Sequence, residues 1–186
     1  MKKFILTSLF LSILFFATAQ KEIGGITIPS KIKFNETTLN LNGAGIREKF
    51  WIDLYVGGLY TDKNSSDAAT IINSDETMSI KLHIISSMIT TKKMTDAVDE
   101  GFKKSTKGKQ AELKDEITKF KGVFTPEIKE GDVYDLVYIP NKGTVVYKNS
   151  KPSITIKGLA FKKALFGIWL CDEPADEDLK EAMLGK

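Results

Sequence analysis

The order of strand-like and helical patterns along the chain constrains its fold most. Runs that alternate apolar and polar residues fill residues 24–61 and 77–85; two helical patterns, three more alternating runs and two final helical patterns follow. A parallel sheet built from βαβ units needs strands and helices that alternate one by one, and this chain lacks that order. We therefore predict an α+β fold, an antiparallel β-sheet with a layer of helices on one face.

Apolar stripes at helical spacing locate the helices. A short helix with a serine cap is expected at residues 66–73. The two central helices carry the stripes Met94, Val98, Gly101, Phe102, Ser105 and Leu113, Ile117, Phe120, Phe124. The C-terminal helices lie in GLAFKKALFGIWLC and DEDLKEAMLG, and in the second Asp176 is the expected N-cap and Gly185 the stop.

Residues 44–61 predict a β-hairpin with its turn near Glu48 and Lys49. From residue 50 onward, apolar and aromatic residues occupy both alternating faces, so we expect both faces to be partly covered. The GAG at 43–45 does not begin a dinucleotide-binding loop, because Glu48 stands where the third glycine is needed and a strand follows.

The first 19 residues have the three parts of a secretory signal peptide. Lys2 and Lys3 precede an apolar run at 4–16, and ATA at 17–19 provides small residues for cleavage before Gln20. The run is too short to span a membrane, and no later stretch is long and apolar enough to do so. We expect one domain over residues 20–186, located in the periplasm or secreted.

Composition excludes several classes of function. Removal of Lys2 and Lys3 lowers the formal net charge from +3 to about +1, and no basic cluster carries the aromatics of a nucleic-acid surface. Cys171 and His83 are the only residues of their kinds, which leaves no internal disulfide, no zinc ligand set and no local catalytic triad. We expect a monomer without metal or cofactor.

Arg47 is the single arginine beside 26 lysines. A guanidinium offers a planar fork of donors that matches a carboxylate and keeps its charge when partly buried. Gly57 and Gly58 on the partner strand are expected to leave a hollow over the sheet beside it. Arg47 then binds either an anion in that hollow or a structural carboxylate such as that of Asp53.

Two segments resemble the chalcone isomerase-like family: GAGIREKFWIDLYVGGLYT at 43–61 and GLAFKKALFGIWLCDEPADEDLKEAMLG at 158–185. The similarity is to bacterial exported members and spans nearly the whole chain from residue 20. It implies an antiparallel sheet and a helical layer that enclose a cleft. In the plant enzymes the cleft binds a flavonoid and closes a ring; in non-enzymatic relatives it binds a fatty acid through an arginine.

Carried over position by position, the resemblance keeps one functional residue. The family arginine matches Arg47, and Tyr55 stands where the enzymes have a threonine. The enzymes' tyrosine and asparagine fall near Thr91 and Val98, and a threonine or serine falls near Ile168. Valine and isoleucine cannot polarise a substrate ketone, so a true chalcone isomerase is not expected. Cys171 departs from the glycine usual in bacterial relatives.

Three hypotheses follow. In the first, the domain binds a small hydrophobic carboxylate such as a fatty acid, with contacts from Arg47, Tyr55, Gly57, Gly58, Phe102 and Trp169. In the second, Arg47 and Tyr55 form the active pair of an isomerase (an intramolecular lyase) with altered substrate. In the third, the cleft is filled, the domain is structural or binds a partner, and Arg47 pairs with a protein carboxylate.

Overall fold

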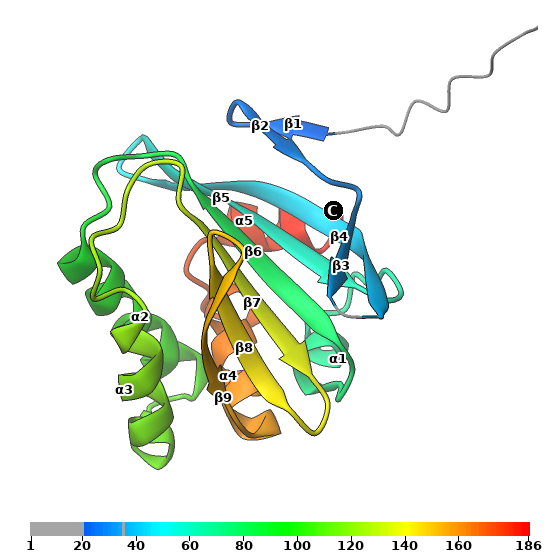
Figure 1. The fold of residues 1–186 in the computed structure, drawn as a ribbon, viewed down its shortest axis with the longest axis vertical. Coiled ribbons are helices and arrows are strands. Elements are labelled where there is room, and N and C mark those ends of the chain that lie inside the picture. Colours follow the sequence, from blue (N-terminus) through cyan, green and yellow to red (C-terminus); the bar gives the residue numbers. More distant parts are fainter. Residues whose placement is uncertain (1–20, 35) are drawn as a thin grey trace, which may run out of the picture.

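A curled antiparallel sheet of seven strands forms the framework (Figure 1). The structure, a computed structural model, describes residues 21–34 and 36–186; the predicted signal peptide lies outside them. The strands pair in the order β3-β4-β5-β6-β7-β8-β9. Their bounds are β3 Lys31–Phe34, β4 Thr37–Lys49, β5 Ile52–Thr61, β6 Met78–Ile84, β7 Val133–Ile139, β8 Gly143–Lys148 and β9 Lys151–Ile156. A small hairpin of β1 Lys21–Ile23 and β2 Ile26–Ile28 precedes them.

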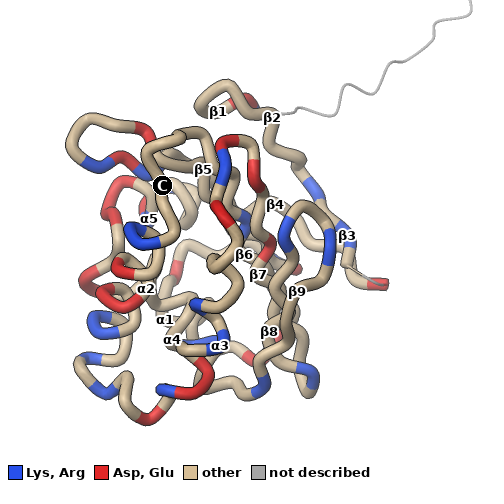
Figure 2. The backbone as a smooth tube through the Cα atoms, turned by 60° about the vertical axis from the view of Figure 1, so that its left-hand side comes forward, with Lys and Arg blue, Asp and Glu red and all other residues tan. Residues whose placement is uncertain are grey.

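The helices gather on one face of this sheet, which confirms the predicted α+β architecture. They are α1 Ala68–Asn73, α2 Thr91–Ser105, α3 Lys114–Gly122, α4 Leu159–Leu170 and α5 Glu177–Met183, with a 3-10 turn at Gln110–Leu113. Asp176 caps α5 as expected, since its side chain accepts a hydrogen bond from Leu179 N at 2.9 Å. The cap of α1 is Asp67 rather than a serine, and it accepts from Ala69 N at 3.0 Å. Figure 2 shows acidic and basic residues interspersed over the strands and helices.

Strand alternation divides the buried residues into two clusters. On the helical face, Ile80, Leu82 and Ile84 of β6 pack with the aromatic residues of α2, α3 and α4. On the other face, Val56 and Tyr60 of β5 pack under the β1–β2 hairpin, where the Tyr60 hydroxyl donates to Pro29 O at 2.9 Å. Both faces of β5 are therefore covered, as its aromatic residues predicted.

The β4–β5 turn lies two residues beyond the predicted position. Lys49 pairs with Ile52, so Phe50 and Trp51 form a two-residue turn. Both have positive φ, 54° and 60°, as a type I′ turn requires. This conformation costs a residue with a side chain about 1–2 kcal/mol. Phe50 is 77% exposed and Trp51 92% exposed, so burial of their own rings does not offset that cost.

Glycines on the helical face of β4 and β5 let α5 approach the sheet backbone closely. A Cβ on Gly43 would lie 2.1 Å from Ala182 O, and one on Gly45 would lie 2.7 Å from Ala182 Cβ. Gly57, the cross-strand partner of Gly45, would meet Met183 Cε at 2.7 Å. The missing side chains therefore make room for a helix of the same chain.

This packing predicts that Gly43→Ala destabilises the fold by about 1–3 kcal/mol, because α5 must move away from a backbone carbonyl that cannot yield. Gly122→Ala is the matched control: nothing lies within 4 Å of a Cβ there, and alanine at a helical position stabilises by up to about 1 kcal/mol. Urea unfolding of the two variants measures the difference. Equal midpoints would show that the α5 contact is not tight.

Candidate functional site

The register of β4 and β5 brings Arg47 and Tyr55 together. They are direct cross-strand partners, two residues beyond the Gly45–Gly57 pair, and so project from the same face of the hairpin. At the glycine pair the sheet is covered by α5. At the Arg47–Tyr55 pair α5 no longer covers it, and a cavity lies there instead.

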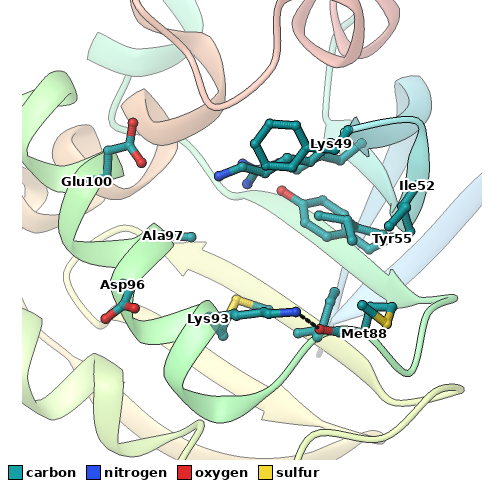
Figure 3. Close-up of a pocket in the computed structure, with 13 residues that line it drawn as sticks. Lys49, Ile52, Tyr55, Met88, Lys93, Asp96, Ala97 and Glu100 are labelled. Carbon is teal, nitrogen blue, oxygen red and sulfur yellow. Dashed lines mark hydrogen bonds between the residues drawn. The ribbon is translucent and has the colours of Figure 1, made fainter.

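The cavity has a volume of about 340 Å³ and opens between the end of the β4–β5 hairpin, the β6–α2 connection and α2 (Figure 3). Its lining comprises Arg47, Lys49, Phe50, Ile52, Leu54, Tyr55, Met88, Ile89, Lys93, Met94, Asp96, Ala97 and Glu100. A narrow inner pocket continues past Arg47 and Tyr55 toward the core. That pocket is lined further by Leu82, Val98, Phe120, Phe124, Ile168 and Trp169.

Arg47 is half-buried at the junction of the cavity and the inner pocket. Its Nε atom is buried and has no hydrogen-bond partner, and its Cζ lies 5.8 Å from the centroid of the Tyr55 ring. Among the described residues no carboxylate oxygen lies within 4.0 Å of the guanidinium. The alternative ion pair with Asp53 is not formed; Asp53 is exposed and lies opposite Glu48 on the hairpin.

The two carboxylates that line the cavity are paired along their own helix. Asp96 Oδ2 lies 2.6 Å from Lys92 Nζ, and Glu100 Oε1 lies 3.0 Å from Lys104 Nζ. The hydrogen bond from Lys104 is the main reason that the pKa of Glu100 is lowered; the more distant charges of Lys49 and Arg47 lower it further.

The cations of the lining have no such partners. Lys49 Nζ lies 5.7 Å from the centroid of the Phe50 ring, and Lys93 Nζ donates to Met88 O at 3.1 Å. Within the described residues neither forms an ion pair with a carboxylate closer than 4.0 Å. The cavity therefore carries positive charge that its own acids, already paired on α2, do not fully neutralise.

Tyr55 is buried, and its hydroxyl is fixed from the core side. The indole Nε1–H of Trp169 on α4 donates to the Tyr55 hydroxyl oxygen at 2.8 Å. A hydroxyl that accepts one hydrogen bond retains its own hydrogen for a second. Tyr55 can therefore donate to a group that sits beside Arg47 in the cavity.

Three residues expected at the ligand lie elsewhere. Gly57 packs against Leu179 and Met183, as described above, and Gly58 lies on the opposite face, where a Cβ would meet the Tyr60 ring at 3.2 Å. Phe102 is fully buried in the core, 5.7 Å from Phe161 between ring centroids. The hollow predicted beside the glycines is occupied by α5, because two glycines facing each other across strands accommodate a helix as readily as a ligand.

Sequence reasoning missed the residues at the entrance to the cavity, among them Phe50, Ile52 and Met88. The sequence did contain a signal for them: the aromatic pair Phe50 and Trp51 stands in the middle of the hairpin predicted for residues 44–61. Of the positions where the plant enzymes carry donors, Val98 and Ile168 line the inner pocket, whereas Thr91 begins α2 away from the lining.

Two further features bear on chemistry. His83 lies half-buried on β6, and burial, together with the charge of Lys81, lowers its pKa. Residues 21–34 and 36–186 contain no cluster of three or more His, Cys, Asp or Glu side chains placed to hold a metal ion. Over the same residues, every helix is too short or too polar to cross a bilayer.

Comparison with known proteins places the fold. A family model described as chalcone isomerase-like matches residues 20–185. Among solved structures, the chain resembles the crystal structure of a fatty-acid binding protein of Arabidopsis thaliana, with a TM-score of 0.68 and 19% identity over 87% of this chain and 92% of that one. At this identity the likeness shows a shared fold. No curated protein sequence matches the chain.

The structural likeness agrees with the curled antiparallel sheet and helical layer described above. The family match covers the chain from residue 20, where the mature domain was expected to begin, almost to its last residue. Its description is also the family that the segments around Arg47 and at the C-terminal helices resemble. This chain therefore belongs to the chalcone isomerase-like family.

Proposed function

We propose that the domain binds a small hydrophobic carboxylate in the cavity between the β4–β5 hairpin and α2. The observation that carries the proposal is Arg47, which lines the cavity with a buried Nε that has no hydrogen-bond partner. A buried donor without a partner costs about 1–3 kcal/mol. A carboxylate in the cavity would pair with the charged guanidinium, and would also accept from the Tyr55 hydroxyl.

The apolar part of the ligand would lie against Leu54, Ile89 and Met94, which line the same cavity. A volume of about 340 Å³ is at the small end of the range for small-molecule sites. The structural neighbour is titled a fatty-acid binding protein, which supports an acyl chain as the apolar part. A short or medium-length fatty acid is therefore the class of ligand that we propose.

The lining favours binding over catalysis. Arg47 and Tyr55 are the polar groups at the inner end, and Val98 and Ile168 supply hydrocarbon where the plant enzymes place donors. An isomerase of altered substrate would have to act through Arg47 and Tyr55 alone. A filled structural cleft, the third hypothesis, fits less well with an open cavity and an arginine that lacks a protein carboxylate.

Export is part of the proposal. Cleavage after Ala19 would release a domain that begins at Gln20, the first residue of the family match. The domain would then act in the periplasm or outside the cell as a monomer. Mass spectrometry of the exported chain tests the cleavage site, and an N-terminus other than Gln20 would contradict it.

Replacement of Arg47 should weaken binding of a carboxylate specifically. We expect Arg47→Gln to reduce affinity for dodecanoic acid by about 10–100-fold, the value of a charge-assisted hydrogen bond, and to leave affinity for dodecanol nearly unchanged. Isothermal titration calorimetry measures both, and mass spectrometry measures lipid that copurifies with the chain. Lys142→Gln, which removes one exposed charge in the β7–β8 turn, is the control.

An equal loss of affinity for dodecanol in Arg47→Gln would show that the arginine supports the fold of the cavity and does not pair with the carboxylate. Failure of the wild-type chain to bind dodecanoic acid, together with no copurifying lipid, would contradict the proposed function itself.

The stability of the core and the binding of a ligand in the cavity should both depend on the hydrogen bond between Trp169 and Tyr55. Tyr55→Phe leaves the Trp169 N–H buried without a partner, and we expect a loss of about 1–3 kcal/mol in the free energy of unfolding. Tyr55→Phe/Trp169→Phe removes both partners and should lose less than the two single variants together. Strict additivity in urea unfolding would show that the bond contributes nothing. Binding of dodecanoic acid should weaken in both variants that lack the hydroxyl.

A further inference from the structure

The large hydrophobic residues that remain exposed in the described part of the chain gather at one place. They are Phe50 at 77%, Trp51 at 92%, Ile52 at 38% and Met88 at 49%, here named the apolar rim. Phe50, Ile52 and Met88 line the entrance of the cavity, and Trp51 stands beside Phe50 in the turn. The turn and the β6–α2 connection that carries Met88 lie at the same end of the molecule (Figure 1).

The geometry points to a membrane-docking site: the apolar rim enters the interfacial layer of a lipid bilayer, so that the cavity opens toward the membrane. This inference rests on the proposed function for its purpose, because a hydrophobic carboxylate would then pass between bilayer and cavity without crossing water. Trp and Phe are suited to this layer, since an aromatic ring is stable at the boundary between headgroups and acyl chains.

The conformation and exposure of the turn residues also indicate a contact outside the chain. Type I′ turns favour Asn-Gly, yet here two bulky aromatic residues hold positive φ. Their rings receive little contact from this chain, being mostly exposed. A cluster of exposed apolar side chains of this kind marks an interaction site.

Charges around the apolar rim fit a bilayer surface and limit the depth of insertion. Lys49 and Lys93 line the cavity next to the rim and can reach anionic headgroups. Glu48 and Asp53 lie opposite each other one pair further along the hairpin, and both are exposed. Because carboxylates remain in water, insertion would stop at the edge of the apolar rim, before Glu48 and Asp53.

The size of the apolar rim favours lipid over protein as its partner. Four partly exposed side chains offer about 500 Å² of surface. A stable protein interface buries about 800 Å² on each partner, whereas a bilayer engages a protruding turn of this size without a matching surface. A second copy of the chain is therefore the weaker alternative and becomes an outcome of the test.

Phe50→Asn/Trp51→Gly tests the inference without harm to the fold, because it installs the pair that the turn prefers. The signal-cleaved chain is mixed with sub-saturating vesicles of equimolar phosphatidylcholine and phosphatidylglycerol. We expect the variant to bind at least about tenfold more weakly than the wild type and to unfold at an equal or higher urea concentration. Both proteins begin at the same cleaved N-terminus, so the apolar run at 4–16 contributes to neither measurement.

A second readout is specific to Trp51. In the wild type, vesicles should shift its fluorescence to shorter wavelength and protect it from acrylamide; the buried Trp169 provides a constant background. Equal vesicle binding by the two proteins, or a Trp51 that stays accessible on vesicles, would overturn the inference. So would a wild-type dimer in sedimentation velocity that the variant abolishes, because the rim would then be covered by a second copy.

The two proposals fail separately. Loss of carboxylate selectivity in the Arg47→Gln experiment would contradict the proposed ligand and leave vesicle binding through the apolar rim intact. Absence of vesicle binding, with the Arg47→Gln result as expected, would contradict docking and leave the ligand site intact.

Discussion

The close packing of α5 against the glycines of the β4–β5 hairpin is the contact on which the rest of the site depends. Gly43 and Gly45 bring the helix so near that a Cβ on either would collide with Ala182, and a Cβ on Gly57 would displace the Met183 side chain. Through this contact α5 covers the helical face of the hairpin at the glycine pairs. The contact also determines where along the hairpin that face is no longer covered. The next outward pair on the same face is Arg47 and Tyr55, which therefore line a cavity.

Charge placement then sets the electrostatics of the cavity. The acids on α2 are paired with lysines one helical turn away, so Arg47 stays without a carboxylate partner among the described residues. In a partly desolvated site, such a guanidinium attracts an anion more strongly than it would in water. Val98 and Ile168 line the inner pocket with hydrocarbon, which is the reason that the proposed ligand has an apolar body.

The fold was predictable from the sequence to a large extent, because strand alternation and helical stripes report burial directly. The two-sided cover of β5 followed from its aromatic residues. Arg47, singled out by its rarity and by the family resemblance, lines a cavity, although not the hollow predicted beside the glycines. The β4–β5 turn was misplaced because Phe50 and Trp51 lack the Asn-Gly chemistry by which type I′ turns are recognised. Phe102 was assigned to the ligand although it belongs to the core, since a stripe of apolar residues does not reveal which part of it faces a cavity.

The sequence by itself determined the α+β class, the alternating faces of the strands and the presence of a single guanidinium, because these depend on local periodicity and side-chain chemistry. Only the tertiary structure decided that the glycines receive α5, that Trp169 holds the Tyr55 hydroxyl, and that Phe50 and Trp51 lie at the cavity entrance. These relations join residues that are far apart in the chain, such as Tyr55 and Trp169, which are separated by 114 positions. The register of strands and the reach of a helix set such distances, and neither leaves a periodic trace in the chain.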